Sequence, residues 1–556
     1  MTILYLLCTG FSLVFSLTCF SFDGGSALAA FLLSCIFTLA FIASLVRFRR
    51  TSEHRTLSVF RKLLEYLPFV LFAAFIIRRA GGTEPGFYLD LASALVWTAL
   101  TITGLILQYR LSDKRVARYY PEIESTTPVK KKLVVHTLEW VDALVQAACL
   151  VLLINLFFFQ LYAIPSESMV PEFMIKDRVL VVKTPSGPKF PLTRVGIPRM
   201  RDYDRGDIVV FNNPHYNDTR EGRIRSFASQ LVYMLTFTTV NINRDESGAL
   251  KADPLVKRVV GIPGEKLMMV DGVLYADRQD GSAFVPVPEE AGWAAWDIAS
   301  LPRSELSLVQ NVPLSRKAYD LLLSVESIRA ALDVAKTREE LAALADRFES
   351  LKPSRDTVGY DASLVPEEKR EIVALFQAND QIARILLTTN GGAAWLRAFL
   401  TGWEESGTPD TLYGTRSRNC NLLLKRAFGK LVVRNAELMI ANATAASFAN
   451  DPVRMALLSE AENYRFFMAV HDQRNMPVFP ETGVIPPDSY MLMGDNRFNS
   501  LDMRHSYSVR LAPVDPADSL SFMYYSNLEP QYVPVERILG TASFRFWPVT
   551  RIGVPR

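Results

Sequence analysis

Two serines and one lysine have the types and settings that could carry out nucleophilic chemistry in this sequence. Ser166 and Ser168 lie in a short stretch bounded by prolines, and Lys257 lies among apolar residues. A serine hydroxyl is a weak nucleophile and needs a base. The five histidines are far apart, and none is placed to serve. A lysine can replace histidine if its amine is neutral near pH 7, which requires lowering its pKa by roughly three units from about 10.4.

A strand over residues 255–262 would give Lys257 suitable surroundings. Side chains alternate along a strand, so Lys257 shares a face with Leu255 and Val259, while Arg258 points the other way. Burial among apolar groups lowers the pKa of a lysine. From these residues alone a solvated basic pair is the better interpretation, so other parts of the sequence must decide.

Four short blocks follow one another along the chain. They are Pro165–Pro171 (PSESMVP), Arg205–Phe211 (RGDIVVF), Lys257–Glu265 (KRVVGIPGE) and Gly494–Arg504 (GDNRFNSLDMR). In this order, with the first directly after an apolar segment, they resemble bacterial type I signal peptidase, a membrane-bound serine protease that removes signal peptides from exported proteins. The resemblance covers neither the first four apolar segments nor a helix-rich stretch described below.

The resemblance implies a role for each matching residue. Ser168 is the expected nucleophile, Lys257 the base that takes its proton, and Ser166 the hydroxyl that binds the oxyanion together with the Ser168 backbone N–H. The supporting positions are Met169 beside the nucleophile, Ser500 orienting the lysine, the ion pair of Asp502 with Arg504, and Asp495 and Asn496 in the same loop. Met503 and Phe498 depart from the family pattern, in which a small serine and an aspartate are common. The resemblance implies no cofactor and no metal.

Five apolar stretches within residues 1–163 predict a multi-pass α-helical membrane region. They cover 2–20, 27–46, 64–77, 87–107 and 143–161. Four approach the roughly 20 residues that a spanning helix needs. The third contains Pro68 and either spans by recruiting residues 58–65 or lies at the membrane interface. We expect the first to be a retained helix, because no basic region precedes it.

Loop charges predict the orientation of this region. Segments 47–63 and 108–138 hold thirteen basic residues, against two in the other loops, which places both segments in the cytoplasm. Five crossings then put everything after residue 163 on the outer, periplasmic side of the cytoplasmic (inner) membrane. Ser168 follows Leu161 by seven residues, so it lies at most about 23 Å beyond the fifth segment.

Short strand patterns replace the apolar runs after Pro165. Strands are expected near 178–183, 207–211, 255–262, 267–277, 489–493 and 541–547, and Asp271-Gly272 is a hairpin signal. They predict an all-β, antiparallel, barrel-like catalytic domain in two parts, 164–296 and 476–556. Residues 297–475 have helical spacing and predict a mostly α-helical insertion, which we expect to be dispensable for the chemistry. Smaller insertions lie near 213–253 and 506–534, and Ser229–Val240 is expected to form a strand pair or to lie on the membrane surface.

The composition narrows the function classes. A net charge of +3 over 556 residues gives no bulk electrostatic basis for binding nucleic acid. Four of the five cysteines lie in apolar runs, which excludes a disulfide framework, and no Cys/His cluster has metal-ligand spacing. The expected partners are exported preproteins with cleavable signal peptides, the lipid bilayer and a secretion translocon. Two alternatives are an inactive scaffold of the same fold and a polytopic transporter or sensor, which would need ionisable residues in mid-span positions.

Overall fold

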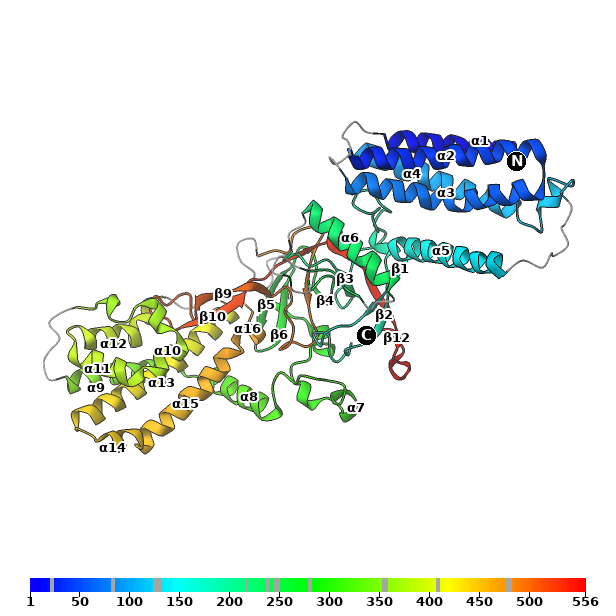
Figure 1. Ribbon diagram of the computed structural model, residues 1–556. Coiled ribbons are helices and arrows are strands. Elements are labelled where there is room, and N and C mark those ends of the chain that lie inside the picture. The colour runs from blue at the N-terminus through cyan, green and yellow to red at the C-terminus, as the bar shows by residue number, and fades with distance from the viewer. Residues whose placement is uncertain are drawn as a thin grey trace.

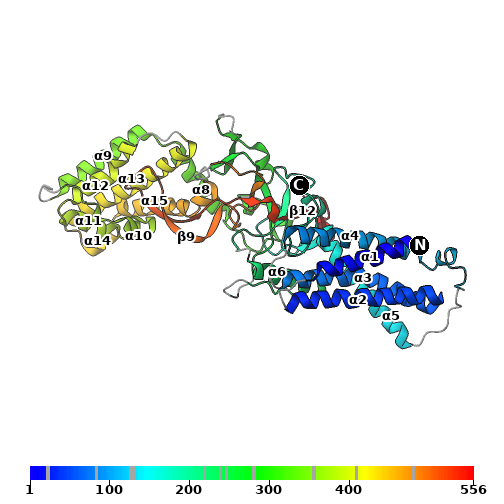
Figure 2. The same ribbon diagram turned by 90° about the horizontal axis from the view of Figure 1, so that it is seen from above.

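The computed structural model of the chain shows three bodies in a row (Figure 1). It describes residues 1–20, 25–81, 86–123, 133–216, 219–236, 240–244, 248, 251–278, 283–352, 359–406, 411–476 and 483–556. A bundle of N-terminal helices lies at one end, a helical body lies at the other, and a β domain lies between them in both views (Figures 1 and 2). Several predicted loop positions, including Asp23 and Lys130 to Lys132, fall outside the described residues.

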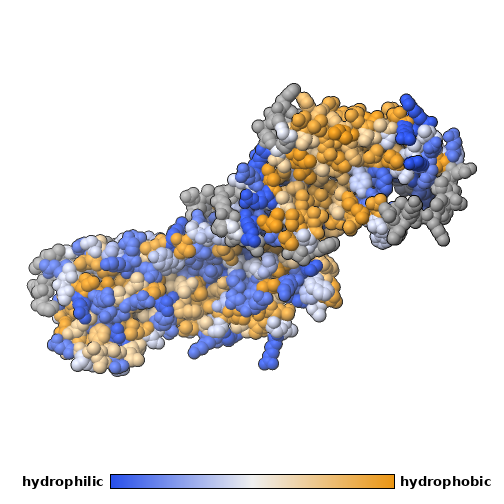
Figure 3. Space-filling model, in the orientation of Figure 1, coloured by the Kyte–Doolittle hydropathy of each residue, from blue (hydrophilic) through white to orange (hydrophobic). Residues whose placement is uncertain are grey.

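The described part of the N-terminal region contains five α-helices. They are α1 (Thr2–Thr18), α2 (Gly25–Thr51), α3 (His54–Ala80), α4 (Phe87–Arg110) and α5 (Leu133–Phe157). By length and composition three of them could cross a membrane, at Ala27–Thr51, Phe87–Arg110 and Thr137–Phe157, while α1 is apolar but shorter. The third apolar segment belongs to the 27-residue helix α3, which has the length to span but carries charged residues near both ends. The face of the bundle seen in Figure 3 is strongly hydrophobic, as expected for lipid-facing helices.

The fifth helix ends earlier than the sequence suggested. It stops at Phe157, and β1 (Phe159–Ala163) then pairs antiparallel with β2 (Arg178–Val182). Backbone pairing with a neighbouring strand therefore competes successfully with helix continuation over residues 159–161. The β domain thus begins directly at the end of the membrane region, and Ser168 follows the last helical residue by eleven positions.

The β domain is built on a curled antiparallel sheet, which agrees with the expected fold class. Its seven strands run in the order β1-β2-β12-β3-β4-β8-β11. The remaining five are β3 (Ile208–Phe211), β4 (Leu255–Gly261), β8 (Ser489–Met493), β11 (Val533–Pro534) and β12 (Ile538–Trp547). A second sheet contains β5 (Lys266–Val270), β6 (Val273–Asp277) and β7 (Val285–Pro286). The predicted hairpin at Asp271-Gly272 is confirmed, since Val270 pairs with Val273 and both turn residues have positive φ.

The helical body is formed mainly by residues 303–474. Its elements are α7 (Arg303–Leu306), α8 (Arg316–Ala330), α9 (Val334–Leu351), α10 (Ile372–Gln377), α11 (Asn379–Thr388), α12 (Gly392–Thr401), α13 (Leu412–Ile440), α14 (Ala445–Ala449), α15 (Pro452–Ala469) and α16 (His471–Arg474). Ser315, Asp333, Thr411 and Asp451 cap four of these helices with side-chain hydrogen bonds. The body has its own apolar core, as a separately packed unit requires.

The segment after the site loop joins this helical body. Strands β9 (His505–Pro513) and β10 (Met523–Leu528) form a separate two-stranded sheet. Phe522 beside β10 is fully buried and packs against Phe376, Phe399 and Phe428 of the helices. Residues 514–524 therefore share a core with the helices, whereas Leu528 and Val533 pack in the core of the β domain.

The strand-pair alternative for Ser229–Val240 is wrong over the described part of that run. Residues Arg220–Leu235 form helix α6, and Thr219 caps it by accepting a hydrogen bond from the Gly222 N–H. Residues 237–239 lie outside the described residues. The cap lies upstream of the run, so the run alone did not reveal the start of the helix.

An aromatic side chain and a hydrogen bond from the bundle help to anchor the β domain to the membrane bundle. Phe190, in a turn after β2, contacts Phe72, Phe75, Trp97 and Phe157 with ring centroids 4.9–6.2 Å apart. Nearby, Arg79 at the end of α3 donates to the Leu192 carbonyl oxygen at 2.9 Å. These contacts hold the β domain against the end of the bundle at which α5 stops.

Candidate active site

Three elements bring the predicted site residues together. Ser166 and Ser168 lie in the turns that follow β1, and Lys257 lies in β4. Strand β8 pairs with β4, with Met493 opposite Arg258, so the loop that starts at Gly494 begins beside the lysine. The four blocks, nearly 340 residues apart at their extremes, therefore meet at one place.

The lysine touches the predicted nucleophile. Lys257 Nζ donates a hydrogen bond to Ser168 Oγ at 2.5 Å, and Ser166 Oγ donates to the same oxygen at 3.4 Å. The Lys257 side chain is buried, with 2% of its surface exposed. Burial lowers the pKa of its amine from 10.5 to about 8, and this effect outweighs the attraction of Asp502 for the charged form. A substantial fraction of the amine is therefore neutral at mildly alkaline pH.

Asn496 holds the backbone of the nucleophile. Its N–H donates to the Ser168 carbonyl oxygen at 3.1 Å, and its Nδ2 donates to the Glu167 carbonyl oxygen at 3.1 Å. Asn496 is fully buried. Its contacts fix the turn that presents Ser168 to Lys257.

Two buried ion pairs stiffen the loop after β8. Asp502 accepts from Arg504 Nε at 2.8 Å and from the Gly494 N–H at 2.8 Å. Although burial opposes ionisation of Asp502, Arg504 holds the pKa of this carboxyl well below its usual range. Asp495 pairs with Arg258 through two hydrogen bonds of 2.8 and 2.6 Å. Breaking such a pair typically costs about 3–5 kcal/mol, because one charge stays buried without its partner.

The two remaining predicted residues occupy different surroundings. Met169 is buried in an apolar cluster with Ile164, Phe173 and Val179 directly beneath the nucleophile turn. Ser500 Oγ is buried and has no hydrogen-bond partner among the described residues, so the structure does not join it to Lys257. A Cβ placed on Gly494 would lie 2.2 Å from Ser500 Oγ and 2.4 Å from the Ser168 carbonyl oxygen. Ser500 Oγ and the Ser168 carbonyl oxygen therefore both lie close to Gly494.

Sequence reasoning missed several groups around the site. Glu290 forms an ion pair with Arg497 at 2.6 Å, and both side chains are buried. Arg258 also lies over the Trp293 ring, 5.1 Å from its centroid. The carboxylate of Glu167 contacts residues 310 and 311 of the helix-rich stretch. Arg258, Arg497 and Glu167 lie inside the four blocks, but nothing in a block indicates that Trp293, Glu290 or residues 310 and 311 would be their partners.

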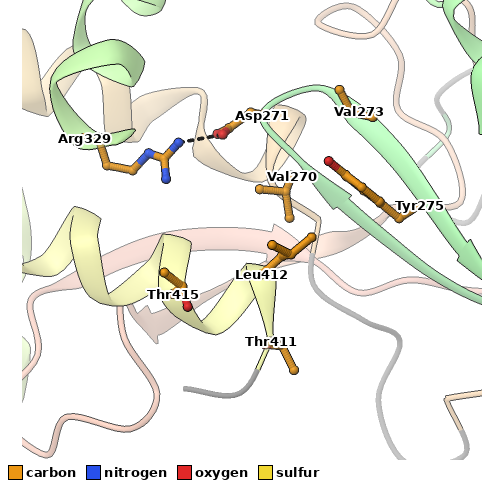
Figure 4. Close-up of a pocket in the computed structure, with 8 residues that line it drawn as sticks. All are labelled: Val270, Asp271, Val273, Tyr275, Arg329, Thr411, Leu412 and Thr415. Carbon is orange, nitrogen blue, oxygen red and sulfur yellow. Dashed lines mark hydrogen bonds and ion pairs between the residues drawn. The ribbon is translucent and has the colours of Figure 1, made fainter. Parts of the chain in front are cut away.

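A separate hollow lies where the β5–β6 hairpin meets the helical body (Figure 4). It has a volume of about 400 Å³ and is lined by Asp271 and Tyr275 of the hairpin region and by Arg329, Thr411 and Thr415 of the helices. Arg329 donates to Asp271 at 2.6 Å across its edge. None of the residues of the Ser168–Lys257 site lines it. Among the described residues no group of three or more His, Cys, Asp or Glu side chains could hold a metal ion.

Comparisons with known proteins point to one family. The chain matches the family described as "Signal peptidase, peptidase S26" over residues 137–291 and 429–547. It is 29% identical over 177 residues to a "Signal peptidase I" of Buchnera aphidicola, covering 32% of this chain and 44% of that protein. It is 28% identical over 155 residues to "Signal peptidase I S" of Bacillus subtilis, covering 28% of this chain and 55% of that protein.

A third relative matches with similar identity and coverage. "Signal peptidase I" of Pseudomonas aeruginosa is 26% identical over 193 residues, covering 33% of this chain and 56% of that protein. The chain thus spans about half the length of the curated relatives that it matches. No solved structure matches it significantly. Both matched segments contain site residues, Ser168 and Lys257 in the first and Ser500 and Asp502 in the second. Through these two segments the chain resembles the family described as "Signal peptidase, peptidase S26".

Proposed function

We propose that this chain is a membrane-bound serine endopeptidase that cleaves N-terminal signal peptides from exported preproteins by a Ser168–Lys257 dyad. The single observation that carries the proposal is the 2.5 Å contact between Ser168 Oγ and the buried Lys257 Nζ. A lysine with a lowered pKa can act as a general base, whereas a solvated lysine cannot. The contact lies within the segment matched to the family.

The arrangement supports an acyl-transfer mechanism. Neutral Lys257 takes the Ser168 proton while Oγ attacks the scissile carbonyl carbon, and the resulting oxyanion accepts hydrogen bonds from the Ser166 hydroxyl and the Ser168 N–H. The ammonium then returns the proton to the leaving amine, which departs as the new N-terminus and leaves an ester on Ser168. Water attacks this ester with Lys257 again as the base, which releases the signal peptide and restores the hydroxyl.

The position of the site suits a substrate held in the membrane. Ser168 lies eleven residues after α5, so it is at most about 36 Å from the end of that helix. A preprotein whose apolar segment is still inserted in the bilayer would present its cleavage site at this height. By family resemblance, small residues occupy the first and third positions before the cut. A secretion translocon is the partner that would deliver such a chain.

Cleavage of a preprotein tests this function, and its pH dependence tests the role of the lysine. The purified full chain in detergent should release mature protein, with the cut located by N-terminal sequencing. Because only the neutral amine accepts a proton, kcat/KM should rise with pH and reach half its maximum near the Lys257 pKa of about 8. Absence of any cleavage would favour the inactive-scaffold alternative. A flat rate between pH 6 and 9 would exclude titration of the lysine.

We propose that the chain lies in the cytoplasmic membrane with its β domain on the outer side. The support is the excess of basic residues in the segments 47–63 and 108–138 together with the apolar helices before residue 157. Protease added to right-side-out vesicles should digest the helical body and spare segment 108–138, which should be cut only after permeabilisation. Digestion of segment 108–138 in intact vesicles with the helical body protected would reverse the topology.

A further inference from the structure

The peptide unit between Glu167 and Ser168 decides where one oxyanion donor points. In a planar trans peptide the C=O and the following N–H point in opposite directions. Asn496 Nδ2 holds the Glu167 C=O on one side at 3.1 Å, so the Ser168 N–H is directed to the other side. Among the described residues this N–H has no acceptor. It is therefore free to bind an oxyanion, provided that the peptide plane keeps its orientation.

The Glu167 side chain supplies a second hold on the same peptide unit. Its carboxylate accepts hydrogen bonds from the backbone N–H groups of Gln310 and Asn311, the latter at 3.1 Å. The residue is 6% exposed, and no cation among the described residues pairs with it. A buried carboxylate without a cation is costly unless hydrogen bonds compensate it. The two backbone donors therefore fix this side chain, and with it the Cα between the two serines.

The segment that provides these donors contacts the site at both of its ends. Ala295 N–H donates to the Asp495 carbonyl oxygen at 2.8 Å, and the Arg497 N–H donates to the Ala295 carbonyl oxygen at 3.0 Å. Ile298 forms an apolar cluster with Val170 and Met174, which follow Ser168, and Leu301 and Val309 pack against that cluster. Residues 295–311 thus link the loop after β8 to the turn that carries both serines.

We propose that Glu167 is a positioning residue for the oxyanion hole, and that residues 297–311 belong functionally to the catalytic unit. This inference rests on the proposed function. The carboxylate is clamped by the Gln310 and Asn311 amides, and the Glu167 carbonyl is clamped by Asn496. Together they hold the Glu167–Ser168 peptide plane so that the Ser168 N–H faces the developing oxyanion. Complete removal of the helix-rich insertion 297–475 would therefore remove part of the site, contrary to the expectation from sequence.

Loss of the hydrogen bonds that Glu167 accepts from the Gln310 and Asn311 amides, here called the clamp, should affect the transition state more than substrate binding. An oxyanion forms only after attack, so a misdirected Ser168 N–H lowers kcat and leaves KM nearly unchanged. Loss of one such donor typically costs about 100- to 1,000-fold in kcat. Since Glu167→Ala loosens the donor without deleting it, we expect kcat to fall about ten- to a hundredfold, with KM within about twofold.

The experiment compares variants of the full chain in detergent on one preprotein. Glu167→Gln keeps a carbonyl oxygen that can accept from the same amides, so it should retain kcat within about fivefold. Glu289→Ala removes an exposed carboxylate that contacts neither Glu167 nor its two donors among the described residues, and it serves as the matched control. In all three variants the midpoint of the pH profile should stay where it is in the unsubstituted chain, because the clamp does not touch Lys257.

Three results would overturn the inference. They are a normal kcat in Glu167→Ala, a loss confined to KM, and a loss in Glu167→Gln as large as that in Glu167→Ala. If Glu167→Ala does not fold, Gln310→Pro deletes one donor instead, and a normal kcat in that variant counts equally against it. Failure of the unsubstituted chain to cleave would refute the proposed function. If Ser168→Ala is inactive but Glu167→Ala cleaves normally, the proposed function stands and only the role of Glu167 is refuted.

Discussion

A full chain carrying Lys257→Arg should cleave no preprotein, although one basic side chain replaces another. A guanidinium stays protonated at every working pH, so it cannot take the Ser168 proton. Ser168→Ala, which deletes the nucleophile, should be equally inactive. Loss of a residue that acts as part of a catalytic unit reduces turnover by at least about 10,000-fold, so both variants should fall below detection. Cleavage is measured by gel shift of a preprotein at pH 9, where the unsubstituted amine is neutral.

Two further variants make the result specific. Lys266→Arg makes the same exchange at a half-buried lysine in β5 and should retain normal cleavage. Ser166→Ala should retain a measurable rate, reduced about 100- to 1,000-fold, because it removes one oxyanion donor and leaves the nucleophile and its base intact. Near-normal cleavage by Lys257→Arg would exclude lysine as the base even if the chain proved to be a signal peptidase.

The environment that makes Lys257 a base is assembled from distant parts of the chain. The alternation along β4 predicted an apolar face for this residue, and Arg258 does leave that face to pair with Asp495. The charged groups that act on the lysine amine, Asp502 and Arg504, come from the loop after β8. Burial still dominates, since the pKa of the amine falls to about 8 despite the nearby carboxylate. The sequence could predict the strand, but only the tertiary fold determines the depth of burial.

The sequence predicted those turns and helices that are determined by residues close together in the chain. The hairpin at Asp271-Gly272 follows from two residues that tolerate positive φ, and the helical spacing within 297–475 predicts helices such as α9. Elements that depend on distant partners were missed. Strand β1 exists because β2 pairs with it, and Phe522 is buried because α12 and α13 surround it. No local pattern in either segment reveals those partners.

The same distinction holds within the candidate site. The four blocks predicted which side chains gather around Ser168, because the family resemblance supplied the long-range arrangement. The contact of Glu167 with Gln310 and Asn311 could not be predicted. It joins a block residue to a segment outside every block, and its donors are backbone N–H groups that any residue type carries. For Ser500 the resemblance implied a hydrogen bond to the lysine, and the structure does not form it.

Gly494→Ala should reduce kcat/KM about a hundredfold. The added Cβ would lie 2.2 Å from Ser500 Oγ and 2.4 Å from the Ser168 carbonyl oxygen, both far inside contact distance. The Ser500 side chain can rotate away, but the Ser168 carbonyl is backbone and is held by Asn496 at 3.1 Å. Relief therefore requires the nucleophile turn to move, and a displacement of about 1 Å typically costs about a hundredfold in rate.

A second substitution separates the two collisions. Ser500→Gly in the Gly494→Ala chain removes the contact with Oγ but leaves the contact with the Ser168 carbonyl, so activity should stay low. Gly292→Ala is the matched control, because a Cβ there has no neighbour within 4 Å. Steady-state cleavage and thermal unfolding are measured for each chain. Activity of Gly494→Ala within threefold of the unsubstituted chain would show that the turn carrying Ser168 adapts without loss. Recovery in the double variant would show that Ser500, and not the carbonyl of the nucleophile, sets the need for glycine at this position.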